Sequence, residues 1–211
     1  MLSEIEVAKE LLKINAIKLH PDDPFTWASG LRSPIYCDNR MTLSHPGLRS
    51  NIKKTLAEQA ASKWNYNKIA GVATAGIAHG ALIADHQELP FIYVRSSAKK
   101  HGARNQIEGQ YQSGDKCLVV EDLISTGGSS IEAVQVLRDA GIEVVGVAAI
   151  FTYLLPKAAK NFEEASCPYF TISNYTALLQ AANELGTLDA EQLESLSKWR
   201  KNPQAWSDQF N

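Results

Sequence analysis

The sequence lacks the features that would tie a protein to a membrane, a disulfide framework or a nucleic acid. Its 211 residues include only three cysteines and no C-x-x-C pair, which indicates free thiols in a reducing compartment rather than disulfides or a zinc site. The longest apolar run, residues 144–155, is too short to span a bilayer, and the charged N-terminus does not resemble a signal peptide. The formal net charge of −2 disfavours a general nucleic-acid partner. We therefore expect a soluble, cytoplasmic protein in which residues 1–211 form one domain.

Two common nucleotide-binding signatures are also missing. The sequence has no G-x-G-x-x-G, which excludes the usual dinucleotide-binding turn. No lysine follows Gly127 and Gly128, which excludes the triphosphate-binding P-loop at this position. A phosphate site in this chain must therefore be of another kind.

The most informative stretch is residues 116–140, which read KCLVVEDLISTGGSSIEAVQVLRDA. The apolar run at 117–120 predicts a parallel strand that is covered on both faces, and we expect Glu121 and Asp122 to end it. A turn rich in hydroxyls and glycine follows, and the period becomes helical from Ile131. The sequence therefore predicts a strand, an acidic pair, a turn and a helix, in that order.

This order of elements describes a binding site. A helix N-terminus offers unpaired N–H groups and a partial positive charge, which suit a phosphate. Carboxylates accept hydrogen bonds from sugar hydroxyls or help to hold a metal ion. A ligand that carries both a phosphate and a nearby diol is a ribose 5-phosphate. The alternative, an ordinary strand-to-helix turn with a serine N-cap, does not explain two adjacent acids at the end of a buried strand.

The stretch VVEDLISTGGS at residues 119–129 resembles the ribose-phosphate signature of the type I phosphoribosyltransferases. The resemblance implies their α/β fold, an open and mostly parallel sheet flanked by helices. It also implies a small N-terminal hood hairpin at about 15–45, a long mobile catalytic loop at about 95–109 and C-terminal helices at about 175–211.

Helical and strand periods place most of the other elements. Capping boxes are expected where Ser3 precedes Glu6 and where Asp189 precedes Gln192. Further strands are expected at 69–73, 91–94, 143–151 and 169–172, and helices after Ser3 and at about 48–63, 176–185 and 189–199. Aromatic residues near the C-terminus are expected to anchor the tail rather than bind a ligand: Trp199, Trp206 and Phe210.

Small residues form a tight turn at Thr74, Ala75 and Gly76, directly after one of these strands. They would allow a ligand phosphate to approach the backbone, which makes the turn a candidate pyrophosphate loop. They would equally allow the following helix to pack closely on the sheet. The sequence leaves these two interpretations open.

The stretch at 25–40, FTWASGLRSPIYCDNR, predicts two short extended runs joined by a turn at Ser29 and Gly30. The residues are equally consistent with a simple flap and with a hood that closes over a flat ligand, with Tyr36 stacked on a ring. The stretch resembles the hood of orotate phosphoribosyltransferases, especially those of Gram-positive bacteria.

Residues 95–109 have no helical or strand period and concentrate positive charge, which is typical of a solvated loop or of a lid over an anionic ligand. The sequence A-K-x-H-G at 98–102 resembles the mobile catalytic loop of the orotate enzymes. In that family the loop reaches into the active site of the partner subunit, which implies a homodimer.

The resemblance covers nearly the whole chain and implies an orotate phosphoribosyltransferase, a pentosyltransferase of pyrimidine biosynthesis. This enzyme joins orotate to 5-phosphoribosyl 1-diphosphate, forming orotidine 5′-monophosphate and diphosphate. Two alternatives are a purine phosphoribosyltransferase and a regulator that senses the phosphoribosyl donor without catalysis. The hood and the loop motif disfavour the first, and the absence of a basic DNA-reading region disfavours a DNA-bound form of the second.

The resemblance also implies roles for residues at matching positions. The implied catalytic residues are Lys99, His101 and Asp122, and the implied orotate contacts are Ser125, Tyr36 and Tyr153. The implied contacts of 5-phosphoribosyl 1-diphosphate are Arg95, Lys99, His101, Glu121, Asp122, Leu123, Ile124, Ser125, Thr126, Gly127, Gly128 and Ser129. Mg²⁺ is the implied cofactor, and we expect it to arrive with the phosphates of the substrate, with no dedicated protein site and with Asp122 as a candidate ligand.

The sequence departs from the enterobacterial members of the family at several of these positions. Lysines are replaced by Ala28, Ala75 and Ser96, an arginine associated with orotate is replaced by Tyr153, and an aspartate is replaced by Glu121. These changes leave open which group neutralises the carboxylate of orotate and which secures the second pyrophosphate contact. Arg32 and the main-chain amides of the hood are candidates for the first role.

Overall fold

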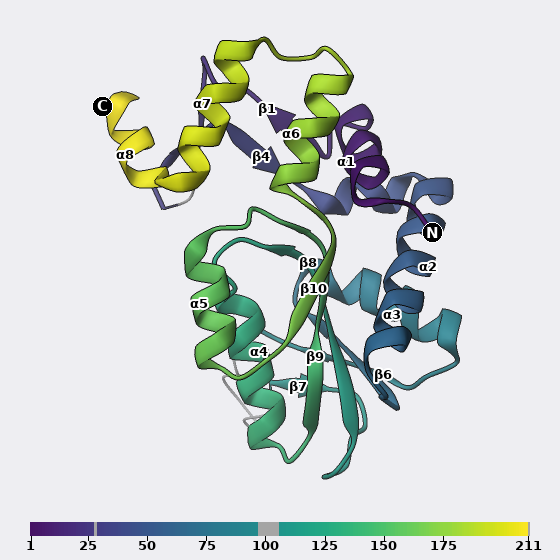
Figure 1. Ribbon diagram of the computed structural model, residues 1–211. Helices are drawn as coiled ribbons and strands as arrows, with labels where there is room; N and C mark the ends of the chain where they lie inside the picture. Colours follow the sequence, from purple (N-terminus) through teal and green to yellow (C-terminus); the bar gives the residue numbers. More distant parts are fainter. Residues whose placement is uncertain (28, 97–105, 211) are drawn as a thin grey trace.

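The computed structural model describes residues 1–27, 29–96 and 106–210, and a mostly parallel sheet lies at its centre (Figure 1). In the described part of the chain, this sheet has six strands in the order β10-β9-β8-β5-β6-β7. Every neighbouring pair is parallel except β6 and β7. The strands are β5 (Lys68–Val72), β6 (Phe91–Val94), β7 (Ile107–Glu108), β8 (Lys116–Ile124), β9 (Glu143–Thr152) and β10 (Tyr169–Asn174).

Helices cover both faces of the sheet, as the unbroken apolar run in β8 predicts. Leu118 and Val120 pack in one hydrophobic cluster with α2 (Pro46–Lys63) and α3 (Ala75–Gln87). Cys117 and Val119, which alternate with them along the strand, pack in a second cluster with α4 (Gly128–Asp139) and α5 (Pro156–Glu164). The α/β prediction is confirmed.

The prediction that Glu121 and Asp122 end the central strand is wrong. β8 continues to Ile124, and its register with β9 pairs Glu121 with Ala149 and Ile124 with Thr152. Strand pairing uses the main chain, so two acidic side chains do not stop it where the neighbouring strand is also extended. The two acids therefore lie among the last four residues of the strand. The helix that follows, α4, begins at Gly128, three residues before the predicted Ile131. The other predicted elements are found with ends shifted by at most two residues.

The hood region contains two small antiparallel sheets instead of one hairpin. β2 (Phe25–Thr26) and β3 (Arg32–Ser33) pair across the predicted turn, in which Gly30 has a positive φ of 84°. After Pro34 the chain changes partner, and β4 (Ile35–Cys37) pairs with β1 (Ile17–Leu19). A 3₁₀ helix, η1 (Asn39–Ser44), then leads into α2.

Helices from both ends of the chain meet above the sheet in Figure 1. α1 (Glu4–Lys13) packs against α6 (Tyr175–Glu184) and β10, and Ser173 Oγ donates to the main-chain oxygen of Glu4 at 2.8 Å. The capping boxes of α1 and of α7 (Ala190–Lys201) are both confirmed. The chain ends in α8 (Pro203–Ser207) and η2 (Asp208–Phe210). Trp199 and Trp206 are buried in the core, as their predicted anchoring role requires, whereas Phe210 is 38 % exposed and contacts only the ring of Trp206 among the described aromatic pairs.

Two further predictions from composition can be compared with the described residues. The three cysteines are free thiols, with Cys117 and Cys167 buried and Cys37 partly exposed. Among the described helices, none combines the length and the apolar character that a membrane crossing demands.

Candidate active site

Glu121 and Asp122 lie at the carboxyl end of β8, the edge at which open α/β sheets bind their ligands. The side chain of Glu121 points toward the start of α4. Its Oε1 accepts a hydrogen bond from the main-chain N–H of Asp122 at 3.0 Å, and its Oε2 accepts from Ser129 Oγ at 3.2 Å and from Ser130 Oγ at 3.5 Å. Glu121 is only 5 % exposed, and Asp122 is partly exposed. The acidic pair and the helix N-terminus therefore form one continuous unit.

The surroundings of the acidic pair favour its protonated forms. Burial, reinforced by the negative charge of Asp122, raises the pKa of Glu121 to about 8. Burial also raises the pKa of Asp122, against which the positive charge of Arg40 acts. The charge of Arg40 therefore does not outweigh burial at the acidic pair, and a ligand that supplies hydroxyl donors or a further cation would stabilise the ionised carboxylates.

The raised pKa of Glu121 predicts that the free energy of unfolding falls as the pH increases from about 5 to about 8. Glu121 has an ordinary pKa of 4.5 and a folded pKa of about 8, so between these values the folded state holds a proton that the unfolded chain releases. This contribution is complete at low pH and is lost as the pH passes the folded value. Denaturant titrations at several pH values in this range would give the free energy of unfolding as a function of pH. For Glu121→Gln this free energy should fall less steeply with pH than in wild type, by the amount that the release of about one proton on unfolding contributes.

A matched control for this measurement is Glu132→Gln, which changes an exposed glutamate on α4, the helix that follows Glu121. Its stability should follow the wild-type dependence on pH. Equal slopes in wild type and Glu121→Gln would contradict the raised pKa.

The turn between β8 and α4 is shaped for an anion. Gly127 has a left-handed φ of 80°, and no side chain caps the N-terminus of α4, which leaves the first N–H groups of the helix without a side-chain acceptor. A Cβ at Gly127 would lie 2.8 Å from Cε2 of Phe162. Asn161 Nδ2 donates to the main-chain oxygen of Thr126 at 2.8 Å. Helix α5 therefore holds the turn in place through contacts of Asn161 and Phe162.

Asn161 and Phe162 were not found by sequence reasoning. Both residues lie on an ordinary amphipathic helix more than 30 residues beyond the turn, and no local pattern marks them. Only the packing of α5 beside α4 brings them to the turn.

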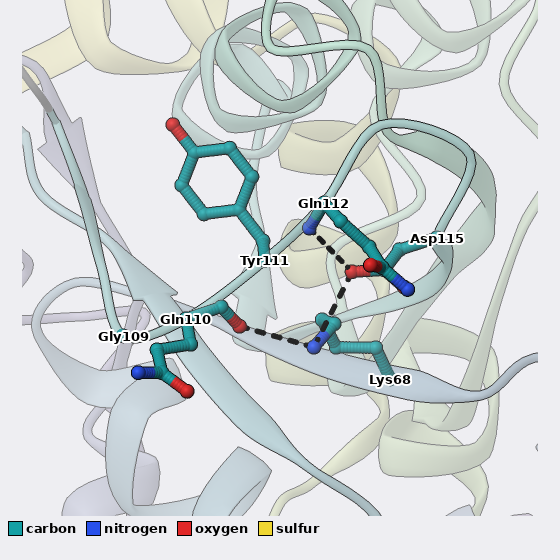
Figure 2. A pocket seen from close by; sticks show the side chains of 6 residues that line it. All are labelled: Lys68, Gly109, Gln110, Tyr111, Gln112 and Asp115. Atoms are coloured by element: carbon teal, nitrogen blue, oxygen red, sulfur yellow. Dashed lines mark hydrogen bonds and ion pairs between the residues drawn. The ribbon is translucent and has the colours of Figure 1, made fainter.

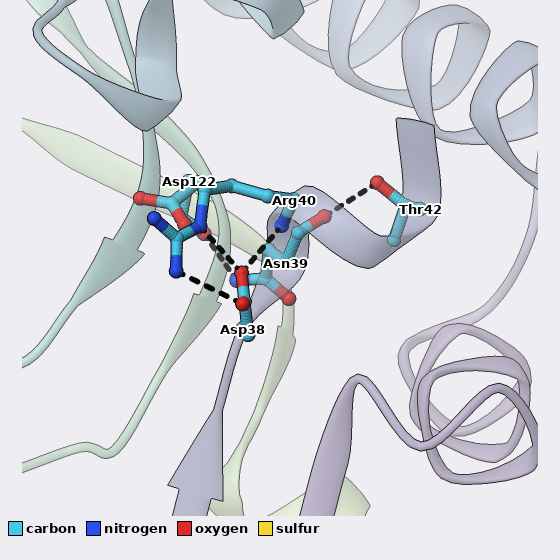
Figure 3. A network of polar contacts seen from close by, with 5 residues as sticks. All are labelled: Asp38, Asn39, Arg40, Thr42 and Asp122. Atoms are coloured by element: carbon cyan, nitrogen blue, oxygen red, sulfur yellow. Dashed lines mark hydrogen bonds and ion pairs between the residues drawn. The ribbon is translucent and has the colours of Figure 1, made fainter. Parts of the chain in front are cut away.

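The hood contacts the acidic pair through the segment that leads into η1 (Figure 3). Asn39 is fully buried, and its Nδ2 donates to the main-chain oxygen of Asp122 at 2.7 Å. Thr42 Oγ1 donates to the main-chain oxygen of Asn39 at 2.6 Å. The buried ring of His79, on α3, contacts the same backbone, and burial lowers its pKa to about 4. Sequence reasoning did not identify Asn39 or His79, whose roles arise from contacts across the fold.

The three predicted orotate contacts have different surroundings. Tyr36 is 42 % exposed and lies on the hood beside Phe25, with ring centroids 5.7 Å apart. Ser125 is half-buried in the turn. Tyr153 is 3 % exposed, stacks on Trp27 at 5.5 Å and meets the edge of Trp199 at 5.7 Å, so its ring belongs to an aromatic core beneath the hood. A contact between Tyr153 and orotate stays a prediction.

Packing accounts for the small residues around Thr74. A Cβ at Gly76 would collide with the main-chain oxygen of Val120, and a Cβ at Gly80 would lie 2.8 Å from Cε2 of Phe91. Both glycines therefore allow α3 to lie close to the sheet. This is one of the two interpretations that the sequence leaves open, and the pyrophosphate role of the turn stays a prediction.

The predicted catalytic loop lies mainly outside the described residues. Lys99 and His101 fall within 97–105, of which nothing is described. At the start of the loop, Arg95 N donates to the main-chain oxygen of Gln106 at 2.8 Å, and Arg95 Nη1 lies 3.6 Å from Glu108 Oε1. The two-residue strand β7, which the sequence did not predict, pairs with β6 and so places both ends of the loop side by side.

A cavity of about 540 Å³ lies at the opposite end of the sheet (Figure 2). Within it, Lys68 Nζ donates to the main-chain oxygen of Gln110 at 3.0 Å and lies 3.4 Å from Asp115 Oδ2. The same carboxylate oxygen accepts from the main-chain N–H of Gln112 at 2.9 Å. These polar groups satisfy one another and fix the segment between β7 and β8. They lie at the amino ends of the strands, away from the acidic pair.

Comparisons with known proteins agree with this geometry. Residues 41–183 match the family model of the phosphoribosyl transferase domain. An orotate phosphoribosyltransferase of Listeria monocytogenes is 50 % identical over 207 residues, which cover 98 % of this chain and 99 % of the relative.

Two solved structures share the fold. Orotate phosphoribosyltransferase from Aeropyrum pernix has a TM-score of 0.75 and 27 % identity, over 87 % of this chain and 99 % of that one. The enzyme of Mycobacterium tuberculosis in complex with 5-phospho-α-D-ribosyl 1-diphosphate has a TM-score of 0.65 and 26 % identity, over 83 % of this chain and 98 % of that one. The fold, the arrangement of the acidic pair and these full-length similarities establish that the chain belongs to the orotate phosphoribosyltransferases, within the phosphoribosyl transferase domain family.

Proposed function

We propose that this protein transfers the phosphoribosyl group of 5-phosphoribosyl 1-diphosphate to orotate, forming orotidine 5′-monophosphate and diphosphate in the cytoplasmic synthesis of pyrimidines. The observation that carries the proposal is the junction of a buried acidic pair with an uncapped helix N-terminus, in a chain 50 % identical to a curated orotate phosphoribosyltransferase over almost its full length. The first feature suits a sugar diol and the second suits its 5′-phosphate.

The ribose 5-phosphate would bind across this junction. In this proposal Asp122, the more exposed acid, accepts hydrogen bonds from the ribose hydroxyls, while Glu121 positions it and secures the start of α4. The 5′-phosphate would lie against the turn between β8 and α4, where several N–H and hydroxyl donors face one anion. Each hydrogen bond to a charged group is worth about 1.5–3 kcal/mol, so a few together would hold a monophosphate.

The chemical step breaks the bond between C1′ of ribose and the diphosphate. Positive charge develops on the sugar and negative charge on the leaving group. We assign Arg95, Lys99 and His101 to the diphosphate, because cations that meet its oxygens as the charge develops lower the barrier. Closure of their loop over the site would also keep water from the activated sugar. Tyr36 and Ser125 are the proposed contacts of orotate.

We propose Mg²⁺ as the cofactor, and the acidic pair fits it. The oxygens of Glu121 already accept three protein donors, which leaves Asp122 as the carboxylate able to approach a cation. Among the described residues there is no group of three or more side chains that could hold a metal ion. Mg²⁺ is commonly held by one or two carboxylates together with waters and substrate phosphates. When bound, it would neutralise charge on the diphosphate.

The decisive experiment follows the near-ultraviolet absorbance of orotate on mixing with the phosphoribosyl donor, Mg²⁺ and the protein. The expected result is a progressive loss of absorbance and the appearance of orotidine 5′-monophosphate. Consumption of a purine base with no consumption of orotate would make it a purine enzyme, and binding of the donor with no consumption of any base would make it a sensor.

We also propose a homodimer in which the loop of each subunit serves the partner's site. If so, mixing Lys99→Ala subunits with Asp122→Asn subunits should restore activity, because each hybrid dimer contains one site with both residues intact. After random exchange, roughly a quarter of all sites would be intact. Differently tagged subunits, refolded together, would allow the hybrid to be purified and assayed. Activity no higher than the sum of the separate variants would contradict the shared loop.

A further inference from the structure

Arg40 lies at the junction between the predicted orotate side of the site and its ribose side. It follows the hood strand β4, which carries Tyr36, and Figure 3 shows its guanidinium next to Asp122. Its positive charge acts on three neighbouring side chains, those of Asp38, Tyr36 and Asp122. Sequence reasoning did not assign a role to Arg40.

The guanidinium of Arg40 is held in one orientation by Asp38. Nε donates to Oδ1 at 2.7 Å and Nη2 donates to Oδ2 at 2.9 Å, which is the two-pronged pairing of arginine with a carboxylate. The side chain is nevertheless 59 % exposed, and Nη1 takes no part in this pair. Arg40 therefore presents fixed N–H donors to the site, and a ligand that binds them need not order a flexible side chain.

The chemistry of orotate requires an anion receptor at this junction. Its carboxylate is attached to C6, the ring atom next to N1, and N1 is the atom that becomes bonded to C1′ of ribose. A group that recognises this carboxylate must therefore stand where the base meets the sugar. The planar fork of arginine matches a carboxylate in shape as well as in charge.

Two other side chains that could contact the base, Arg32 and Tyr153, are placed less well for this role. Arg32 lies on the β2–β3 hairpin, where its Nη1 donates to Thr26 Oγ1 at 3.0 Å. Tyr153, which stands where enterobacterial members carry an arginine, is buried among aromatic rings. Of the two arginines in the described part of the hood, Arg40 is the one beside the acidic pair.

We propose that Arg40 binds the carboxylate of orotate and thereby makes the site specific for orotate over pyrimidines that lack this group. This inference rests on the proposed function. It assigns the neutralising cation to the base of the hood, a different element from the one used by the enterobacterial members. Asp38 is then a positioning residue that keeps the guanidinium turned toward the ligand.

The test compares two nucleotides that differ only in the carboxylate, orotidine 5′-monophosphate and uridine 5′-monophosphate. Their dissociation constants would be measured by calorimetry for wild type, Arg40→Gln, Arg40→Lys and the hood control Arg32→Gln. Arg40→Gln should weaken the orotidine nucleotide by about 10- to 100-fold, the scale of losing a charge-assisted hydrogen bond. The uridine nucleotide should bind within about 3-fold of wild type, because it makes no such bond. Arg40→Lys keeps the charge but loses the planar fork, so its affinity for the orotidine nucleotide should lie between those of wild type and Arg40→Gln. Arg32→Gln should bind both nucleotides as wild type does.

Two outcomes would overturn the role of Arg40 alone. One is an equal loss of affinity for both nucleotides, and the other is a loss confined to diphosphate, measured in a parallel titration, which would place Arg40 on the leaving group. Both outcomes bear on Arg40 only if the wild-type protein consumes orotate. A wild-type protein that does not consume it removes the proposed function itself, so the two failures are distinguishable. Because the side chain is exposed, melting temperatures of the variants should stay close to wild type.

Discussion

Replacement of Lys99 by alanine is expected to lower the turnover number by about 10²–10³-fold at saturating substrates. Lys99 is the lysine of the A-K-x-H-G motif, and we assign it to the diphosphate as negative charge develops there. An interaction made mainly in the transition state affects kcat more than substrate binding. Steady-state assays with orotate and the donor both saturating would measure this effect directly.

The adjacent Lys100 provides a matched control, because Lys100→Ala removes the same charge from the same loop. It should retain turnover within a few-fold of wild type if position matters more than net charge. A Lys99→Ala protein with unchanged kcat would refute the assignment of this loop as the catalytic lid. Equal losses of turnover in both variants would mean that the loop acts through its overall positive charge and not through a specific contact of Lys99.

Asp122→Asn is expected to lower kcat/KM for the phosphoribosyl donor by about 10–10²-fold while the fold stays intact. The carboxylate accepts hydrogen bonds that a neutral amide accepts more weakly, and its negative charge also favours a nearby cation. Because burial raises the pKa of Asp122, a neutral side chain at this position should not destabilise the protein. Donor kinetics and a thermal melt of the same preparation would test both parts.

Asp85→Asn is a suitable control, since Asp85 is an exposed aspartate on α3 far along the helix from the acidic pair. Normal donor KM and kcat in Asp122→Asn would remove the acidic pair from the mechanism. A large fall in melting temperature would instead give the Asp122 carboxylate a structural role, through its electrostatic interaction with Arg40 of the hood.

Local patterns in the sequence were sufficient for the central motif. Four consecutive apolar residues before an acidic pair required a strand covered on both faces, and the described structure buries Cys117, Leu118, Val119 and Val120 completely. The glycine-rich turn and the helical period after it followed from backbone freedom and side-chain spacing, which act within a few residues. The same is true of both capping boxes.

The end of β8 was not predictable from its own residues. Glu121 and Asp122 have side chains that usually leave a strand, yet the extended neighbour β9 continues the main-chain pairing to Ile124. The hood shows the same limit. The sequence located its turn, but the change of partner from β3 to β4 depends on β1, which lies about 20 residues earlier in the chain.

The sequence by itself determined the kind of chemistry at the site, because hydroxyls, acids and a helix start follow one another within ten residues. Only the tertiary structure decided what surrounds that motif. Asn161 and Phe162 shape the turn from α5, Asn39 joins the hood to Asp122, and Arg40 stands beside them with a fixed guanidinium. These contacts join residues up to 83 positions apart, and such pairs meet because the packing of whole helices and strands brings them together. No spacing along the chain carries that information.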